Sequence, residues 1–351
     1  MIDVSNCIMR YFNIIHTEDF VLHSKKLAHR MITGIRKGYK ENINEPNIVR
    51  LIENIINSVG RFETKNRFFS IITKSIFIHG HRSNVDFEYY GRRTRRELGD
   101  IIFILSVVYN NRKYFEKMTI TQFKKSDIAS WNLYNRSARE QLYLLSRFPK
   151  FNGADRSLIP NKSYNLPNYS RCLGTHGLLY SPGDFSIISS NLLETILHNR
   201  KRIYLENLLQ YCSTNYFYIA KPIFIPDLLD IPILFEFYKC FPFIWDFPLL
   251  GVSCVAYNCY DFSDKYLIGL IGEMIYAKKM FYNRLAFQFL QDFLMSVKAK
   301  AIKKNQKEIR EFVDSFYQFE YSNPPKYEGS GESDYEGGGI GIIHTIIKLS
   351  E

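Results

Sequence analysis

The pattern of apolar and polar residues predicts two strands joined by a tight turn in the first half of the chain. The run Ile101–Tyr109 is rich in β-branched and aromatic residues, which favour strands. Asn110-Asn111 follows, and asparagine tolerates the positive φ angles that hairpin turns require. A second apolar-leaning run ends in Gln122-Phe123-Lys124-Lys125. Antiparallel pairing would therefore place Asp100, just before the first strand, beside the end of the second.

The rest of the chain alternates between helical and strand-like patterns. Apolar residues at three- and four-residue spacing predict helices over residues 1–40 and from Glu45-Pro46 to Gly60. We expect the final strand, at residues 340–349, to pair within the C-terminal part of the chain. The other predictions are a strand or helix end at 68–79, a half-exposed strand at 85–90, a helix at 139–145, a loop at 151–171, turns at 174–177 and 181–184, a helix pair at 187–212, a proline-broken aromatic core at 222–259, helices at 267–313 and a loop at 321–339.

A carboxylate, a side-chain amide and an ammonium group would converge at one end of the predicted hairpin. Gln122 and Lys124 are two residues apart, so they project from the same face of a strand. Mg²⁺ prefers oxygen ligands and keeps several of its waters, so Asp100, the Gln122 side-chain oxygen and a backbone carbonyl could hold it. Lys124 could then orient an attacking water or stabilise the charge that develops on a phosphate.

The basic excess of the chain lies in the half that contains this hairpin. The formal net charge is +11. Residues 1–150 contain 26 Lys and Arg against 14 Asp and Glu, whereas residues 151–351 contain 20 against 21. Such an excess favours binding to nucleic-acid phosphates, although solvated basic helices give a similar imbalance. The candidates for phosphate contact are the basic run before Asp100 and the last lysine of the hairpin: Arg92, Arg93, Arg95, Arg96 and Lys125.

The remaining composition narrows the class of protein. The chain is 46% hydrophobic, which suits a sizeable buried core, and it contains no charge-free apolar stretch of membrane-spanning length. Its first residues lack the form of a signal peptide, so we expect a cytoplasmic protein that does not associate with membranes. The six cysteines form no Cys-x-x-Cys pair, which favours free thiols over a zinc site.

The segments Glu97-Leu98-Gly99-Asp100 and Gln122-Phe123-Lys124 resemble the two halves of the PD-(D/E)XK nuclease motif. In that superfamily an Asp on one strand is followed by Glu-x-Lys or Gln-x-Lys on the next, and here Gln122 replaces the commoner Glu. The resemblance covers about residues 53–151. It implies an α/β fold with a restriction-endonuclease-like mixed sheet flanked by helices in residues 1–151. A mostly helical α+β accessory domain, which senses or docks a partner, would follow in residues 172–351.

The same resemblance implies metal-dependent hydrolysis of phosphodiester bonds, with Mg²⁺ or Mn²⁺ as cofactor and DNA ahead of RNA as substrate. Asp100 and Gln122 would bind the metal, Lys124 would position the water, and Glu97 would assist. The biological role it implies is that of an effector in bacterial defence against phage. Second-tier site candidates are carboxylates near the helix before the sheet, two neighbouring histidines and a glutamine on the following helix: Glu53, Glu63, His79, His81 and Gln141.

Other interpretations remain open at this point. Because a neutral Gln122 binds metal more weakly than a carboxylate, the site could be degenerate, and the protein could dock a larger partner such as an ATPase. It could also bind RNA through Arg92–Arg96 without cleaving it, assemble as a homo-oligomer, or carry an ordinary structural hairpin. Whether Asp100, Gln122 and Lys124 converge within the reach of one metal ion is the first discriminating observation.

Overall fold

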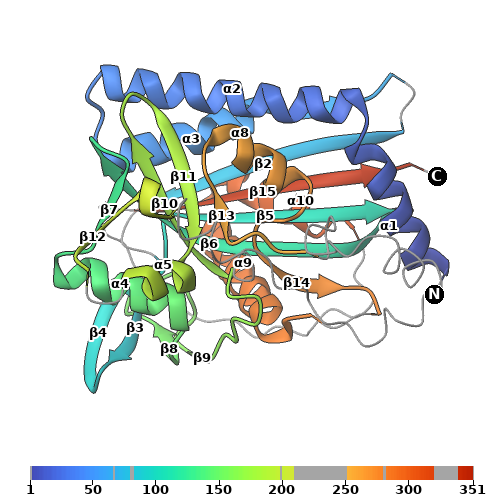
Figure 1. The fold of residues 1–351 in the computed structure, drawn as a ribbon. Helices are drawn as coiled ribbons and strands as arrows, with labels where there is room; N and C mark the ends of the chain where they lie inside the picture. Colours follow the sequence, from blue (N-terminus) through green and yellow to red (C-terminus); the bar gives the residue numbers. More distant parts are fainter. Residues whose placement is uncertain are drawn as a thin grey trace, which may run out of the picture.

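A computed structural model of the chain describes residues 2–65, 68–79, 83–197, 200–208, 251–279, 282–319 and 339–350. Within these residues the centre is one nine-stranded mixed sheet, flanked by helices (Figure 1). The strand order is β1-β2-β15-β5-β6-β10-β11-β13, and β14 also pairs with β6. These strands are β1 (Arg61–Glu63), β2 (Phe69–His79), β5 (Ile101–Tyr109), β6 (Arg112–Ser126), β10 (Gly174–Tyr180), β11 (Asp184–Ser189), β13 (Val255–Ala256), β14 (Glu273–Ala277) and β15 (Gly339–Leu349). The predicted α/β class with a mixed sheet between helices is thus confirmed.

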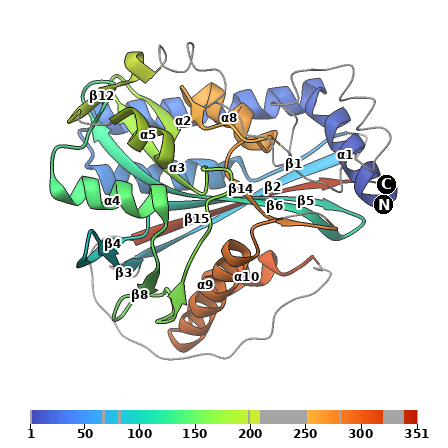
Figure 2. The same cartoon turned by 60° about the horizontal axis from the view of Figure 1, so that its bottom comes forward.

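Helices cover both faces of the sheet (Figure 2). One face carries α1 (Ile2–Ile15), α2 (Glu18–Lys40), α3 (Glu45–Val59) and α8 (Cys259–Leu267). The other face carries α9 (Arg284–Lys303) and α10 (Lys307–Phe316). At the end of the sheet where β6 finishes, α4 (Arg136–Arg147) packs against α5 (Ser190–Leu197) and β10. The apolar side chains of the sheet thus lie between two helical layers, which is how a mixed sheet buries both faces.

Two smaller sheets stand beside the central one. β3 (Asn84–Tyr89) and β4 (Arg92–Glu97) form a hairpin, which continues through β8 (Phe151–Gly153) to β9 (Ser163–Tyr164). β7 (Ser130–Asn132) pairs with β12 (Arg202–Tyr204). The β3–β4 hairpin projects from the end of the molecule at which β5 begins (Figure 1).

Local sequence chemistry sets the ends of α2 and α3. Thr17 caps α2 by accepting a hydrogen bond from the Phe20 amide, and Asn44 caps α3 in the same way. The two helices approach closely because α2 presents glycine at the crossing. A Cβ atom on Gly34 would lie 1.9 Å from Ile55 Cδ1, so a side chain there would require the Ile55 side chain to move. The short link between them therefore places the start of α3 beside the end of α2.

The expected pairing of the final strand within the C-terminal part is wrong. β15 lies between β2, to which it is antiparallel, and β5, to which it is parallel. β10 and β14 also pair with β6, so strands from both sides of the predicted boundary at residues 151–172 share one sheet. An almost wholly apolar strand such as β15 is stable only when both of its edges and both of its faces are covered, which the middle of the sheet provides.

Several local predictions also need correction. The turn predicted at 174–177 is part of strand β10. The predicted helix pair at 187–212 begins as strand β11, continues as the short helix α5 and then forms strand β12. The predicted helices at 267–313 are interrupted by β14. The helices over 1–40, 45–60 and 139–145 are confirmed, with a break between α1 and α2. Most of the predicted aromatic core at 222–259 and nearly all of the loop at 321–339 lie outside the described residues.

In the part of the chain that the structure describes, every helix is too short or too polar to span a lipid bilayer.

Candidate functional site

The β5–β6 hairpin brings Asp100 and Gln122 into direct contact. Asn110 and Asn111 adopt positive φ angles of 50° and 56° in the turn, as the sequence predicts. The resulting register pairs Ile101 with Thr121, and the Asp100 amide donates to the Thr121 carbonyl at 2.9 Å. The Asp100 side chain then reaches the end of β6, where its Oδ2 accepts hydrogen bonds from Gln122 Nε2 and the Phe123 amide, each at 2.6 Å. The predicted convergence of these two residues is confirmed.

Gly99 permits this close approach. A Cβ atom on Gly99 would lie 2.8 Å from the Ile120 side chain and 3.2 Å from the Thr121 carbonyl oxygen. Real side chains almost never tolerate such contacts, so a larger residue would move the chain away from β6. The glycine before Asp100 therefore holds the carboxylate within reach of Gln122.

The environment of Asp100 favours the protonated carboxyl. Removal from water raises the pKa of Asp100 to about 7, against the opposing effects of Lys124 and the Phe123 amide. The nearby carboxylates of Glu45 and Glu97 also raise this pKa. Near neutral pH a proton therefore competes with any cation for the Asp100 oxygens.

Gln122 contains an unsatisfied acceptor beside this carboxyl. Its Oε1 atom is buried and lacks a hydrogen-bond partner among the described residues, although its Nε2 atom bonds to Asp100. A buried acceptor without a partner costs free energy, which a ligand or a cation can recover. Asp100 and Gln122 together offer one carboxylate and one amide oxygen, a donor set that suits Mg²⁺ or Mn²⁺. The fit requires the amide to rotate, because Nε2 now occupies the side facing Asp100.

Lys124 lies at the same end of β6 and is held by Glu45. The Lys124 ammonium forms an ion pair with Glu45 Oε1 at 3.0 Å, and both side chains are partly exposed. The other oxygen, Glu45 Oε2, accepts the Lys125 amide at 2.6 Å. Glu45 is thus a site residue that sequence analysis does not identify. Its position in the first turn of α3, where acidic residues are favoured, predicts a helix start and gives no sign of its contact with Lys124.

His176 is a second neighbour that sequence analysis missed. It lies on β10 directly opposite Gln122, is buried, and shares a hydrogen bond of 2.8 Å with Ser190 through Nδ1. Burial lowers the pKa of His176 to about 3, and the positive charge of Lys124 contributes in the same direction. The imidazole is therefore neutral and positions the strand rather than exchanging protons at neutral pH.

Two of the second-tier candidates, Gln141 and Glu53, lie near the start of β5, whereas Glu63 lies at the other end of the sheet. Gln141 Nε2 donates to the Glu97 carbonyl at 2.5 Å, so it supports the chain just before Asp100. Glu53 of α3 is buried beside Gly341, where a Cβ atom would lie 3.6 Å from both Glu53 Cγ and the Asp100 carbonyl oxygen, and it also lines a cleft of about 810 Å³ beside β2. Glu63 is exposed and pairs with Arg61 at 3.0 Å.

Of the two candidate histidines, His79 pairs through its backbone with Gly339, at the same end of the sheet as Asp100, and His81 lies outside the described residues. For His79 only this strand pairing is described.

The basic run on β4 is largely engaged by acidic partners. Arg93 and Arg95 both bind the Asp86 carboxylate of β3, at 3.0 and 2.7 Å. Arg96 pairs with the buried carboxylate of Glu140 on α4. The sequence run is therefore divided between the two faces of a hairpin, as alternate residues of a strand must be.

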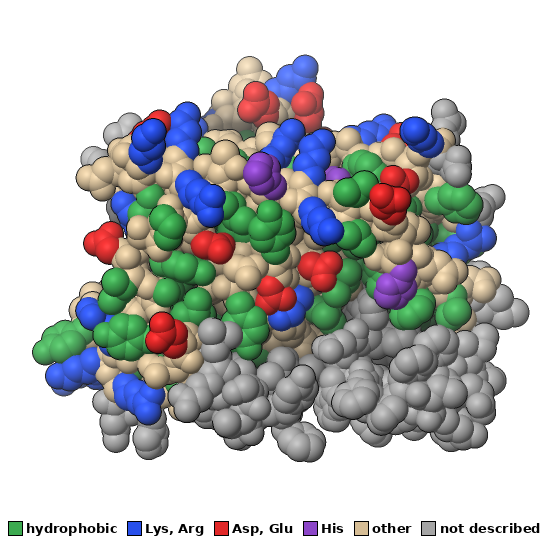
Figure 3. All heavy atoms as spheres, turned by 45° about the horizontal axis from the view of Figure 1, so that its top comes forward, with side chains coloured by type: hydrophobic (Ala, Val, Ile, Leu, Met, Phe, Trp, Pro, Cys, Tyr) green, Lys and Arg blue, Asp and Glu red, His purple; other side chains and the backbone are tan. Residues whose placement is uncertain are grey.

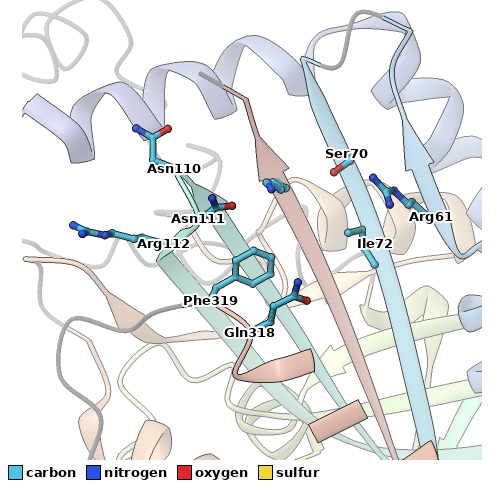
Figure 4. A pocket seen from close by; sticks show the side chains of 9 residues that line it. Arg61, Ser70, Ile72, Asn110, Asn111, Arg112, Gln318 and Phe319 are labelled. Carbon is cyan, nitrogen blue, oxygen red and sulfur yellow. The ribbon is translucent and has the colours of Figure 1, made fainter. Parts of the chain in front are cut away.

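A second cleft, of about 690 Å³, lies at the opposite end of the hairpin (Figure 4). It is bordered by the turn at Asn110-Asn111, and Arg61 and Arg112 lie at opposite sides of it. Because the turn is as far from Asp100 as the hairpin allows, this cleft is separate from the candidate site. Among the described residues, His, Cys, Asp and Glu side chains form no cluster of three with metal-binding geometry.

Comparisons with protein-family models, with curated proteins and with solved structures find no match to this chain.

Proposed function

We propose that the protein is a metal-dependent nuclease that hydrolyses phosphodiester bonds at the end of the β5–β6 hairpin. The observation that carries the proposal is the contact between Asp100 and Gln122, together with the buried Gln122 oxygen that lacks a partner among the described residues. The sequence motif predicted these two residues and Lys124, and all three lie at one end of the sheet. A restriction-endonuclease-like arrangement of the sheet belongs to the same proposal.

Each residue has a distinct part in this hypothesis. Asp100 and Gln122 would hold Mg²⁺ or Mn²⁺, which would supply Lewis-acid activation of the phosphate and a more acidic bound water. Lys124 would stabilise negative charge on the phosphate, and Glu45 orients its ammonium group before substrate arrives. Substrate phosphate would compete with Glu45 for Lys124. Because that ion pair is partly exposed, exchanging it for a phosphate costs little.

A cleavage assay tests this function directly. Purified protein is incubated with supercoiled plasmid and, separately, with RNA, in Mg²⁺, in Mn²⁺ and in EDTA. We expect metal-dependent cleavage that falls by about two to three decades in Asp100→Asn and in Lys124→Met. Asp127→Asn, an exposed carboxylate just beyond β6, is the matched control and should retain activity. Wild-type rates in Asp100→Asn, with unchanged thermal stability, would reject the proposed site.

A non-catalytic interaction protein is the second candidate. It is favoured by the two N–H groups that already occupy Asp100 Oδ2 and by the raised pKa of that carboxyl. In this case the hairpin end would be a satisfied structural contact, and the protein would bind nucleic acid or a partner such as an ATPase. Binding to nucleic acid without cleavage in either metal would favour this alternative. The anti-phage role rests on the sequence resemblance and stays a prediction.

A further inference from the structure

The exposed side of α2 is rich in basic side chains. From Phe20 to Lys40 the helix contains no Asp or Glu. We call its exposed basic residues the α2 stripe: Lys25, Lys26, His29, Arg36, Lys37 and Lys40. In Figure 3, which turns the top of the molecule toward the viewer, Lys and Arg side chains are frequent in the upper half of the face, with Asp and Glu side chains among them.

The spacing of the α2 stripe follows the helical repeat. Lys25, Lys26 and His29 lie three or four residues apart, as do Arg36, Lys37 and Lys40, and a seven-residue step, two helical turns, separates His29 from Arg36. Lys25 and Lys40 are 15 residues apart, which corresponds to about 22 Å along the axis. A duplex carries one phosphate per roughly 3.4 Å of axis on each strand, so the stripe is long enough to follow about six phosphates.

The stripe ends at the candidate site. Tyr39, the neighbour of Lys40, donates a hydrogen bond from its hydroxyl to the Ser126 carbonyl at 2.8 Å. The Lys125 ammonium lies 5.1 Å from the centre of the Tyr39 ring and donates to the Ile43 carbonyl. The last turn of α2 is thus joined directly to the end of β6, on which Lys124 and Gln122 lie.

The opposite side of α2 is already buried. Phe20, Leu27, Met31 and Ile35 pack in the core against the sheet and its neighbouring helices. Leu22 is the one large apolar side chain of α2 that is strongly exposed. A helix that binds at a membrane surface inserts its apolar face, and α2 has no such face to offer. Charge complementarity therefore favours a rigid polyanion over an anionic lipid surface.

We propose that the α2 stripe docks the phosphodiester backbone of a nucleic acid and leads it to the Asp100–Gln122 pair. This rests on the proposed nuclease function and assigns the main docking surface to α2 instead of the Arg92–Arg96 run. The two surfaces differ in their partners. Arg93, Arg95 and Arg96 form ion pairs with Asp86 and Glu140. In the α2 stripe, Lys37 pairs with the exposed Glu41 at 3.9 Å, and α2 itself contributes no acidic side chain between Phe20 and Lys40.

Equilibrium binding in EDTA tests the docking surface apart from catalysis. The probes are a labelled DNA duplex about two helical turns long and an RNA duplex of the same sequence, titrated between roughly 50 and 200 mM salt. The variant is Lys25→Ala/Lys37→Ala/Lys40→Ala. The matched control is Lys300→Ala/Lys303→Ala/Lys304→Ala at the end of α9, which removes the same charge from the other face of the sheet.

We expect the affinity of the α2 variant to fall about tenfold. The slope of log K against log salt should become shallower by about two to three. The α9 control should bind within about twofold of wild type. The relative loss on the DNA and RNA probes identifies which backbone the surface prefers.

Equal losses in both variants, or an unchanged slope in the α2 variant, would overturn the proposal. The proposal would also be overturned if the α2 variant bound nucleic acid as wild type does but no longer bound phosphatidylserine-containing vesicles. That result would assign the stripe to a membrane surface. The binding measurement in EDTA does not depend on catalysis. If the salt slope of the α2 variant changes as expected but the cleavage assay shows no activity in Mg²⁺ or Mn²⁺, the nuclease hypothesis fails and the docking surface stands.

Discussion

The Gln122 amide donates to the Asp100 carboxylate at 2.6 Å, and this contact occupies an oxygen that a metal ion would need. The same hydrogen bond therefore holds the two side chains together and opposes the binding of a cation between them. For Gln122 to serve as a ligand, its amide must turn so that the unpartnered Oε1 atom faces Asp100. Cation binding then costs one hydrogen bond to a carboxylate, which is worth roughly 1.5–3 kcal/mol.

The raised pKa of Asp100 predicts a loss of stability as pH rises. The pKa is about 7 in the folded protein and about 3.9 in an unfolded chain, so the folded state holds the proton more tightly. The contribution of this group to the free energy of unfolding should therefore be greatest below about pH 4 and fall by on the order of 3 kcal/mol toward pH 7. Urea unfolding of wild type and Asp100→Asn across this range measures the difference.

Asp100→Asn should lack this part of the pH dependence, and Asp127→Asn should retain it. Saturating Mn²⁺ should reverse the trend in wild type, because a cation binds the ionised carboxyl and competes with its proton. Parallel pH profiles for wild type and Asp100→Asn, with and without Mn²⁺, would contradict both the raised pKa and the metal site.

The Lys124–Glu45 ion pair predicts that Glu45 affects the cleavage rate through the position of Lys124. Glu45→Gln keeps an oxygen that can accept the Lys125 amide, but it removes the charge that holds Lys124. Because both side chains are partly exposed, we expect a stability loss of under about 1 kcal/mol. Cleavage should change several-fold, whereas Lys124→Met should lose about two to three decades. Similar losses of activity in the two variants would instead mean that Glu45 itself contacts substrate.

Buried Lys117 predicts a second, opposite pH dependence. Burial lowers its pKa to about 7, although Cys172 and Glu273 act to raise it, and its ammonium donates to the Gly251 and Gly269 carbonyls at 2.6 Å. An unfolded lysine has a pKa near 10.4, so the unfolded chain binds the proton more tightly. Stability should fall as pH is lowered from about 10 to 7, by on the order of 3 kcal/mol.

Lys117→Met should remove this slope and leave stability at neutral pH equal or higher, since an apolar side chain of similar length avoids burying the charge. Lys303→Met, at an exposed position, is the control and should keep the wild-type profile. Chemical denaturation at several pH values provides the measurement, and a wild-type slope in Lys117→Met would contradict the assignment.

Local pattern was sufficient for the hairpin that carries the site. Residues 101–109, the two asparagines and the second run specify strand, turn and strand over a short separation, and register follows from turn length. The contact between Asp100 and Gln122 could therefore be predicted. Glu45 and His176 could not, because they reach the site through a helix start and a parallel strand distant in sequence.

The place of β15 in the sheet could not be predicted for the same kind of reason. Its residues are apolar on both faces, which indicates a buried strand but does not name its partners. Its partners, β2 and β5, are more than 200 residues earlier in the chain. Gly174 and Gly177 make the sequence of β10 resemble a turn. Both are required in the strand, where a Cβ atom would lie 2.1 Å from the Leu145 carbonyl oxygen or 2.4 Å from the Phe123 ring.

Gln122 is the main departure from the commoner motif, and replacing it by Glu should tighten metal binding. An ionised Glu adds a full negative charge to the site, whereas the amide contributes only a carbonyl dipole. Without a cation, the new carboxylate would face Asp100 without the present hydrogen bond, so one of the two would stay protonated and the free protein would lose stability. For a given set of ligands, Mn²⁺ usually binds more tightly than Mg²⁺. We therefore expect wild type to bind Mn²⁺ at lower concentration than Mg²⁺.

Calorimetric titration of Mn²⁺ into wild type and Gln122→Glu tests the role of this side chain, and we expect at least about a tenfold gain in affinity, equal to 1.4 kcal/mol. Gln141→Glu is the matched control: it adds the same charge on α4, where Gln141 contacts the Glu97 backbone, and should change affinity little. The cleavage rate need not rise with affinity, because a second carboxylate beside the scissile phosphate opposes attack. Equal gains in both variants would show a general effect of charge. Identical affinities in wild type and Gln122→Glu, or binding in neither, would remove Gln122 from the metal site and favour the non-catalytic protein.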